Sequence, residues 1–174
     1  MDDLVPFGGV DYFAFLTLLV FGRGMDFLST WIATPNLVLE ANPLARKLGW
    51  RGSIALNVVI CPVFALWPLP ALMITTTSLL VAAHNLQNGW LMRSLGEHEY
   101  RLWMARQIQS THLGLFLFCL GLQTALFGGI GAALVIFSPS SLVPFAIGMG
   151  TIAYAIALLV YTLLSVRRIR RSTG

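Results

Sequence analysis

Ionisable and amide side chains stand inside long apolar stretches of this sequence, at spacings that place them on common helix faces. Asp26 is followed by Ser29 and Thr30 at three and four residues, and His84 is followed by Asn88 at four. Residues three or four apart share one face of a helix, so each group can act together. Carboxylates and imidazoles commonly serve as general acids, general bases or zinc ligands. The candidate catalytic residues are Asp26, His84, His112 and Glu40, and the candidate substrate-binding residues are Ser29, Thr30, Asn42, Asn85 and Asn88.

The composition places these side chains in a membrane. The chain has 174 residues, of which 57% are hydrophobic and only 10% are charged, and its mean hydropathy is +0.78. A soluble domain carries about 25% charged residues, so the composition excludes an ordinary soluble enzyme. Polar groups inside a bilayer are costly and usually face the bundle interior or a wet cavity. The polar residues inside the apolar stretches are therefore the place to look for a function.

The elements that must position these residues are predicted to be helices. One span needs about 20 apolar residues, and the apolar stretches predict five spans, at about 12–34, 54–66, 71–92, 107–137 and 142–166. Asn42 and Pro43 are the preferred types for a helix cap and a first helical residue, so a short interfacial helix is expected at about 43–49. The predicted fold is all-α: a polytopic membrane protein with a single transmembrane domain, 1–174.

The basic residues indicate how this bundle is oriented. Ten of the eleven lysines and arginines fall in the connections after the first and third predicted spans or in the C-terminal tail, whereas Asp2, Asp3 and Asp11 precede the first span. Basic residues collect in short cytoplasmic loops, which predicts the N-terminus outside and the C-terminus in the cytoplasm. The net charge of +4 then needs no nucleic-acid partner. The expected partner is the lipid bilayer, in a bacterial or archaeal cell membrane.

Three ionisable residues are predicted to lie at one depth. At the rise of an α-helix, Asp26 and His84 lie roughly 12 and 13 Å from the cytoplasmic ends of their helices, and His112 lies roughly 9 Å from its own. Together they could hold a divalent metal such as zinc, which would activate water. The two histidines could instead ligate haem. A simpler interpretation is structural: Asp26 pairs with Arg23, and the histidines join helices as neutral hydrogen-bonding groups.

These residues are compatible with three classes of function. The leading prediction is a membrane-embedded hydrolase or transferase that acts on a lipid-like substrate from the cytoplasmic half of the bundle. The alternative is a small ion or solute transporter or channel in which Asp26 and His84 couple protons. It would work as a homo-oligomer because five short helices enclose little volume. The third is a haem-binding or structural membrane subunit whose polar groups hold helices together.

The sequence also contains a two-part signature. The pattern Asp-x-x-Ser-Thr begins at residue 26, and Glu-x-Asn-Pro-Leu begins at residue 40. This arrangement resembles that of a family of uncharacterised small multi-pass prokaryotic membrane proteins, and the resemblance covers about residues 22–49. It implies a membrane-protein fold without an activity. It gives additional weight to Asp26, Glu40 and Asn42 as site residues.

Overall fold

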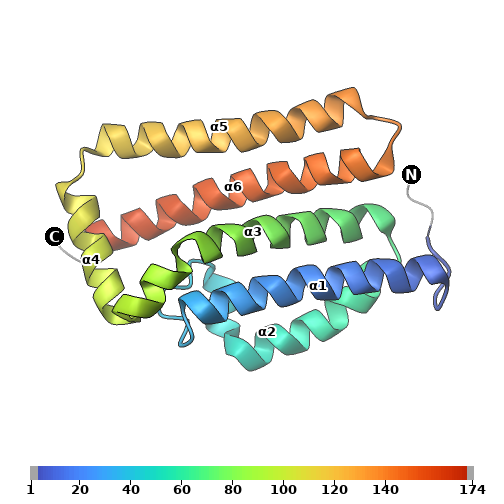
Figure 1. Ribbon diagram of the computed structural model, residues 1–174, viewed down its shortest axis with the longest axis horizontal. Helices are drawn as coiled ribbons and strands as arrows, with labels where there is room; N and C mark the ends of the chain where they lie inside the picture. Colours follow the sequence, from blue (N-terminus) through green and yellow to red (C-terminus); the bar gives the residue numbers. More distant parts are fainter. Residues whose placement is uncertain (1–3, 172–174) are drawn as a thin grey trace.

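The described part of the chain folds into six helices. The computed structural model describes residues 4–171, with side chains through Arg167, and contains no strand in that range (Figure 1). The helices are α1 (Val10–Ala33), α2 (Pro43–Phe64), α3 (Pro68–Leu95), α4 (Glu97–Ser110), α5 (Leu113–Phe137) and α6 (Leu142–Arg171). The predicted all-α fold is confirmed. Asp2, Asp3 and the last tail side chains, which enter the orientation prediction, lie outside the described part.

Four of these helices are long and apolar enough to cross a membrane: α1, α3, α5 and α6 as far as Arg167. The chain is therefore a membrane-embedded protein. Local sequence sets the helix ends, since α1 stops shortly before Pro35 and α3 stops at Gly96, whose φ of 79° lies in the left-handed region that favours glycine. The spans predicted at 12–34, 71–92 and 142–166 coincide closely with α1, α3 and α6.

α2 differs from the two elements predicted in its place. The structure joins the expected interfacial helix at 43–49 and the expected span at 54–66 into one helix with a break at Gly49 (φ 64°, ψ −173°). α2 is not among the four helices that satisfy the length and hydropathy of a span, because Arg46, Lys47 and Arg51 leave only a short apolar stretch. Figure 1 nevertheless shows α2 running back along α1, so the chain returns across the bundle before α3 begins.

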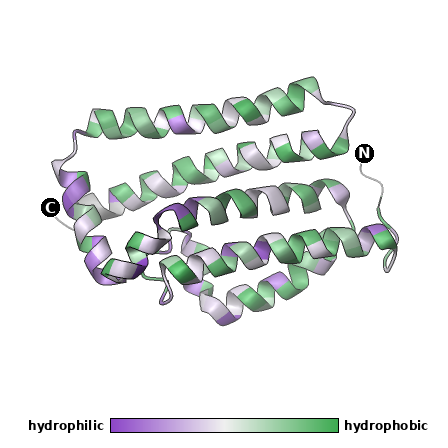
Figure 2. Ribbon diagram, viewed as in Figure 1, coloured by the Kyte–Doolittle hydropathy of each residue, from purple (hydrophilic) through white to green (hydrophobic). Residues whose placement is uncertain are grey.

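The predicted span at 107–137 begins too early. The chain leaves the helical conformation at Thr111 and His112, where ψ is 138° and 118°, so α4 and α5 are separate helices. α4 lies across one end of the bundle (Figure 1), which we call the α4 end. It is much more hydrophilic than α5 (Figure 2), and only Tyr100 and Ile108 are buried in it. A helix of this kind is typical of the membrane interface.

Close backbone contacts join the long helices. In Figure 1 they lie side by side in the order α5, α6, α3, α1, with α2 beside α1. A Cβ atom built on Gly131 of α5 would lie 2.7 Å from the carbonyl oxygen of Gly148 in α6, and one on Gly150 would lie 2.8 Å from the carbonyl oxygen of Met73 in α3. The glycines of α6 therefore let two neighbouring helices approach it closely, as small residues do in membrane bundles.

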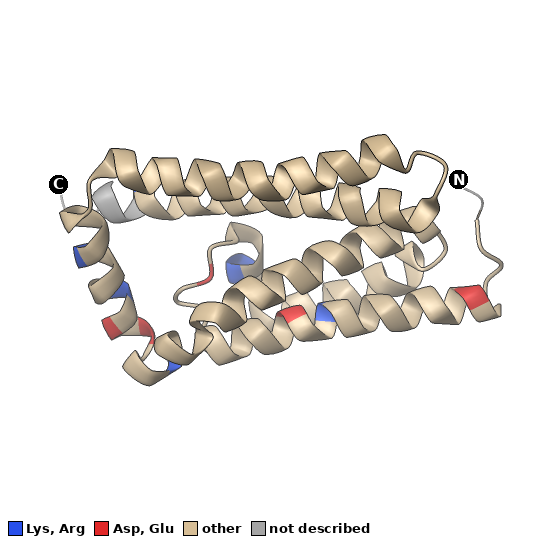
Figure 3. Ribbon diagram, turned by 45° about the horizontal axis from the view of Figure 1, so that its top comes forward, with Lys and Arg blue, Asp and Glu red and all other residues tan. Residues whose placement is uncertain are grey.

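A cluster of buried side chains lies in the half of the bundle opposite the α4 end. It comes from the first half of α1, the end of α2 and the start of α3: Tyr12, Leu19, Cys61, Ala65 and Ala71. Most charged side chains that the structure describes lie on α4 and at the start of α2, with an acidic and a basic position side by side within α1 (Figure 3). The first turn of α1 contains Asp11, and the last turn of α3 contains Arg93. The two halves of the bundle thus differ in charge.

Candidate functional site

A polar cavity lies in the half of the bundle nearer the α4 end. It has a volume of about 440 Å³ and is enclosed by the second halves of α1, α3 and α6, the connection 34–42, and the start of α2. The structure brings seven of the nine predicted site residues to its wall: Asp26, Thr30, Glu40, Asn42, His84, Asn85 and Asn88. These residues come from three separate segments, so folding brings together side chains that are far apart in the sequence.

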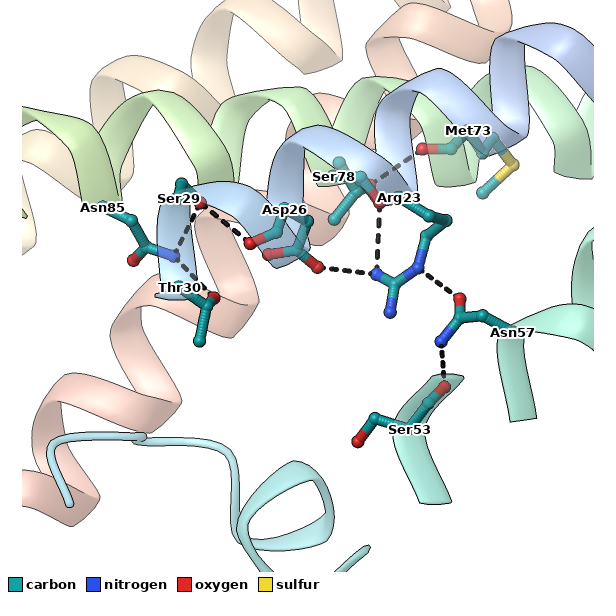
Figure 4. A network of polar contacts seen from close by, with 10 residues as sticks. Arg23, Asp26, Ser29, Thr30, Ser53, Asn57, Met73, Ser78 and Asn85 are labelled. Carbon is teal, nitrogen blue, oxygen red and sulfur yellow. Dashed lines mark hydrogen bonds and ion pairs between the residues drawn. The ribbon is translucent and has the colours of Figure 1, made fainter. Parts of the chain in front are cut away.

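Ser29 lies directly behind this wall. It is fully buried, and its hydroxyl donates to the carbonyl oxygen of Asp26 at 2.9 Å. The Asn85 amide donates to the hydroxyls of both Ser29 and Thr30, at 3.3 Å each (Figure 4). The face that α1 presents to α3 therefore holds the Asn85 side chain at the edge of the cavity. Ser29 therefore contacts Asn85 and is not part of the cavity lining.

Asp26 is already paired within its own helix. Arg23 donates from Nη1 to the Asp26 carboxylate at 2.8 Å, which is the structural ion pair that the sequence analysis raised as the simpler interpretation. The same guanidinium donates from Nε to Asn57 of α2 at 2.6 Å and from Nη1 to Ser78 of α3 at 3.2 Å (Figure 4). Arg23 therefore links three helices, and the role of Asp26 that the contacts show is that of its counter-ion.

His84 has a different environment from Asp26. It lies on the cavity wall, half-buried, one residue before Asn85. No other described side chain or backbone group hydrogen bonds to its imidazole. A half-buried imidazole without a protein partner can bond to water or to a ligand in the cavity, because both ring nitrogens are polar. Of the predicted site residues, His84 is thus the ionisable group most free to act on a bound molecule.

Glu40 and Asn42 enter the cavity from the connection between α1 and α2. The Glu40 carboxylate accepts from the backbone N–H of Asn42 at 2.7 Å, and the Asn42 side chain caps α2 by accepting from the backbone N–H of Leu44 at 3.0 Å. Burial raises the pKa of Glu40 above its ordinary value; the Asn42 bond opposes this, and the charge of Asp26 adds to it. Glu40 can therefore hold a proton at a higher pH than a free carboxyl group.

A residue that the sequence analysis missed holds this connection in place. Glu97, at the start of α4, accepts hydrogen bonds from the Thr34 hydroxyl and from both the backbone N–H and the side-chain amide of Asn36, the latter two at 2.9 Å. Thr34 in turn accepts from the backbone N–H of Leu39 at 3.0 Å. Glu97 stands in a charged segment that reads as a solvated loop, so nothing in its own neighbourhood indicates the contact.

α6 also supplies cavity residues that were not predicted. Tyr154, Leu158, Tyr161 and Ser165 all line the cavity, and their spacing of four, three and four residues is that of one helix face. This periodicity is visible in the sequence. None of these four residues belongs to a charged type, so the stretch has no feature that marks it as part of a site.

His112 does not join the cavity. It is the residue before α5, it is exposed, and its side chain makes no capping hydrogen bond. The depth prediction for His112 was wrong because it assumed an unbroken helix from residue 106, whereas the chain turns at Thr111 and α4 lies across the end of the bundle. The predicted metal ligands Asp26, His84 and His112 therefore do not come together. Among the described residues, no group of three or more His, Cys, Asp or Glu side chains could hold a metal ion.

Comparisons with family models, with curated proteins and with solved structures give no match to this chain. The resemblance to the uncharacterised prokaryotic family stays a prediction. The case for a function therefore rests on the cavity itself.

Proposed function

We propose that this membrane protein binds the polar end of a lipid-like molecule in the cavity near its α4 end and acts on it by hydrolysis or group transfer. The observation that carries the proposal is the convergence of His84, Glu40 and three asparagines on one cavity of about 440 Å³. A volume of this size lies within the range of small-molecule sites. The setting within a membrane bundle favours a substrate that is dissolved in the bilayer.

The roles proposed for the side chains follow from the polar atoms that have no hydrogen-bond partner in the described part of the protein and from the protons that they can exchange. His84 would act as the general base, because its imidazole has no protein partner among the described residues and can take a proton from water or from an acceptor hydroxyl. Glu40, whose raised pKa favours the protonated form, would donate a proton to the leaving group. Asn42, Asn85 and Asn88 would orient the polar group through their amides. Asp26 would act indirectly, by fixing Arg23.

The test is to incubate the purified protein with a total polar-lipid extract and to follow every lipid species by mass spectrometry. We expect one lipid class to be consumed, and we expect His84→Ala to slow its consumption by about 10²-fold or more, the usual contribution of a general base. His112→Ala is the matched control, since His112 is exposed and outside the cavity, and it should leave the rate unchanged.

Two results would contradict this proposal. The first is equal lipid consumption by His84→Ala and the wild-type protein. The second is solute or ion flux in proteoliposomes that Asp26→Asn abolishes, together with no change in any lipid. The second result would favour the transporter alternative, in which the protein forms a wet path through both leaflets.

A further inference from the structure

A second, apolar groove runs along the outside of α1. It lies between α1 and α2, has a volume of about 280 Å³, and is lined by aliphatic side chains such as Leu16, Val20 and Val58. Several of these are open to the surroundings of the bundle, Val58 with 67% of its surface. Only Cys61 of α2 is buried, so α2 covers α1 loosely and leaves the groove accessible from the bilayer.

The groove and the polar cavity share two residues. Arg23 and Phe27 line both spaces, and the guanidinium of Arg23 lies 5.7 Å from the centre of the Phe27 ring. On one side of these residues the wall is aliphatic, and on the other it carries the amides, His84 and Glu40. A molecule with an apolar chain and a polar end would match these two adjoining surfaces.

Arg23 also retains hydrogen-bonding capacity at the junction. A guanidinium has five N–H groups. Its Nε and Nη1 atoms donate to Asn57, Asp26 and Ser78, whereas Nη2 has no acceptor among the described residues. The two N–H groups of Nη2 are therefore available to an acceptor oxygen of a ligand. The ester and phosphate oxygens of a lipid, which lie between its chains and its head, supply such an acceptor.

We propose that the groove between α1 and α2 holds one acyl chain of a phospholipid from the surrounding bilayer, whose polar end reaches the cavity past Arg23. This inference rests on the proposed function and names its substrate class. The occupant is a lipid because the groove opens to the bilayer beside apolar helices. It also continues, past Arg23 and Phe27, into the polar cavity.

Gly24 offers a way to close the groove without disturbing the fold. It lines the groove, and apart from its chain neighbours and the backbone of its own helix, a Cβ atom built on it meets nothing within 4 Å. Gly24→Leu should therefore fill the groove and leave the helix intact, since Leu is a better helix former than Gly. Gly129 of α5 has the same free space and lies outside the groove, so Gly129→Leu is the matched control.

The experiment reconstitutes each protein in phosphatidylethanolamine vesicles that contain a small fraction of phosphatidylethanolamine with a diazirine in mid-chain. After illumination, mass spectrometry compares labelling of the α1 and α2 groove residues with labelling of α5, which reports the ordinary lipid layer. We expect stronger labelling of the groove in the wild-type protein and in Gly129→Leu. In Gly24→Leu the ratio should fall about tenfold, which corresponds to ~1.4 kcal/mol of binding free energy.

Gly24→Ala adds too little volume to exclude an acyl chain and should keep the wild-type labelling ratio. The series therefore separates the effect of filling the groove from the effect of replacing Gly24. Val58→Trp closes the groove from α2 and replaces Gly24→Leu if that variant does not fold. An unchanged ratio in every variant would overturn the proposal, as would a groove labelled more weakly than α5 in the wild type, the result expected if a second copy of the chain covered it. Labelling requires no turnover, so loss of the groove signal and loss of His84-dependent lipid consumption are separate failures.

Discussion

At the scale of single residues, Glu97 anchors the connection that forms part of the cavity wall. Its carboxylate is the acceptor for Thr34 and Asn36, and the connection that these residues begin carries Glu40 and Asn42 into the cavity. Burial acts to raise the pKa of Glu97, but the hydrogen bonds from Thr34 and Asn36 outweigh it and hold that pKa below its ordinary value of 4.5. The ionised carboxylate is therefore the form that the folded protein stabilises.

We expect Glu97→Gln to lower the stability of the protein by about 1 kcal/mol near neutral pH, because its amide group would face the Asn36 amide, donor to donor. The stabilisation from a lowered carboxyl pKa is present above the ordinary value and is lost as the pH falls through the lower folded-state pKa. Thermal unfolding of both proteins in detergent between neutral and acid pH measures this: the difference should vanish on acidification. Glu99→Gln is the control, since Glu99 is exposed on the same helix, and an effect of equal size there would contradict the assignment.

At the scale of elements, the seam between α5 and α6 depends on two glycines. A Cβ on Gly131 would lie 2.7 Å from the Gly148 carbonyl oxygen and 2.8 Å from a side-chain carbon of Ile152. These separations are too short for non-bonded atoms, so Gly131→Ala must push the two helices apart. We expect a loss of about 1–3 kcal/mol in the free energy of unfolding, the usual cost of overpacking.

Gly129→Ala is the matched control for the seam. Gly129 lies two residues away on the same helix, and a Cβ built on it meets nothing within 4 Å beyond its chain neighbours and its own helix backbone. Its substitution should therefore be neutral or slightly stabilising through helix propensity. Denaturant unfolding in mild detergent compares the two variants. A Gly131→Ala protein as stable as Gly129→Ala would show that α5 and α6 are not held at this distance.

At the scale of the whole molecule, the two ends of α6 lie at opposite ends of the bundle. α6 begins after the connection 138–141 and runs back to the α4 end (Figure 1). With basic residues on the cytoplasmic side, we expect green fluorescent protein fused after Arg171 to fluoresce in cells. We expect alkaline phosphatase inserted at Ser140 to be active outside. Active phosphatase at the end of α6 would reverse this orientation.

The sequence predicts the helical membrane fold well because long apolar runs and prolines are local signals. It also singles out seven of the polar residues that line the cavity, because ionisable and amide side chains such as Asp26, His84 and Asn85 are costly in a bilayer and stand out in an apolar stretch. It fails where long-range contacts decide: Glu97 looks like a surface residue until α4 folds against Thr34, and His112 looks like a mid-helix residue until the chain turns at Thr111. The hydroxyl-bearing residues on one face of α6 recur at helical spacing, but none is of a charged type, so the sequence does not mark them as site residues.

The ion pair between Arg23 and Asp26 has a consequence for the insertion of the protein into the membrane. Either charge alone would cost about 2.5–3.5 kcal/mol at the centre of a helix that enters the bilayer. Because the two lie three residues apart on α1, the helix carries its own counter-ion and needs no partner to neutralise it. α1 can therefore insert during biogenesis before α2 and α3 are made, and the bonds from Arg23 to Asn57 and Ser78 form only when those later helices assemble around it.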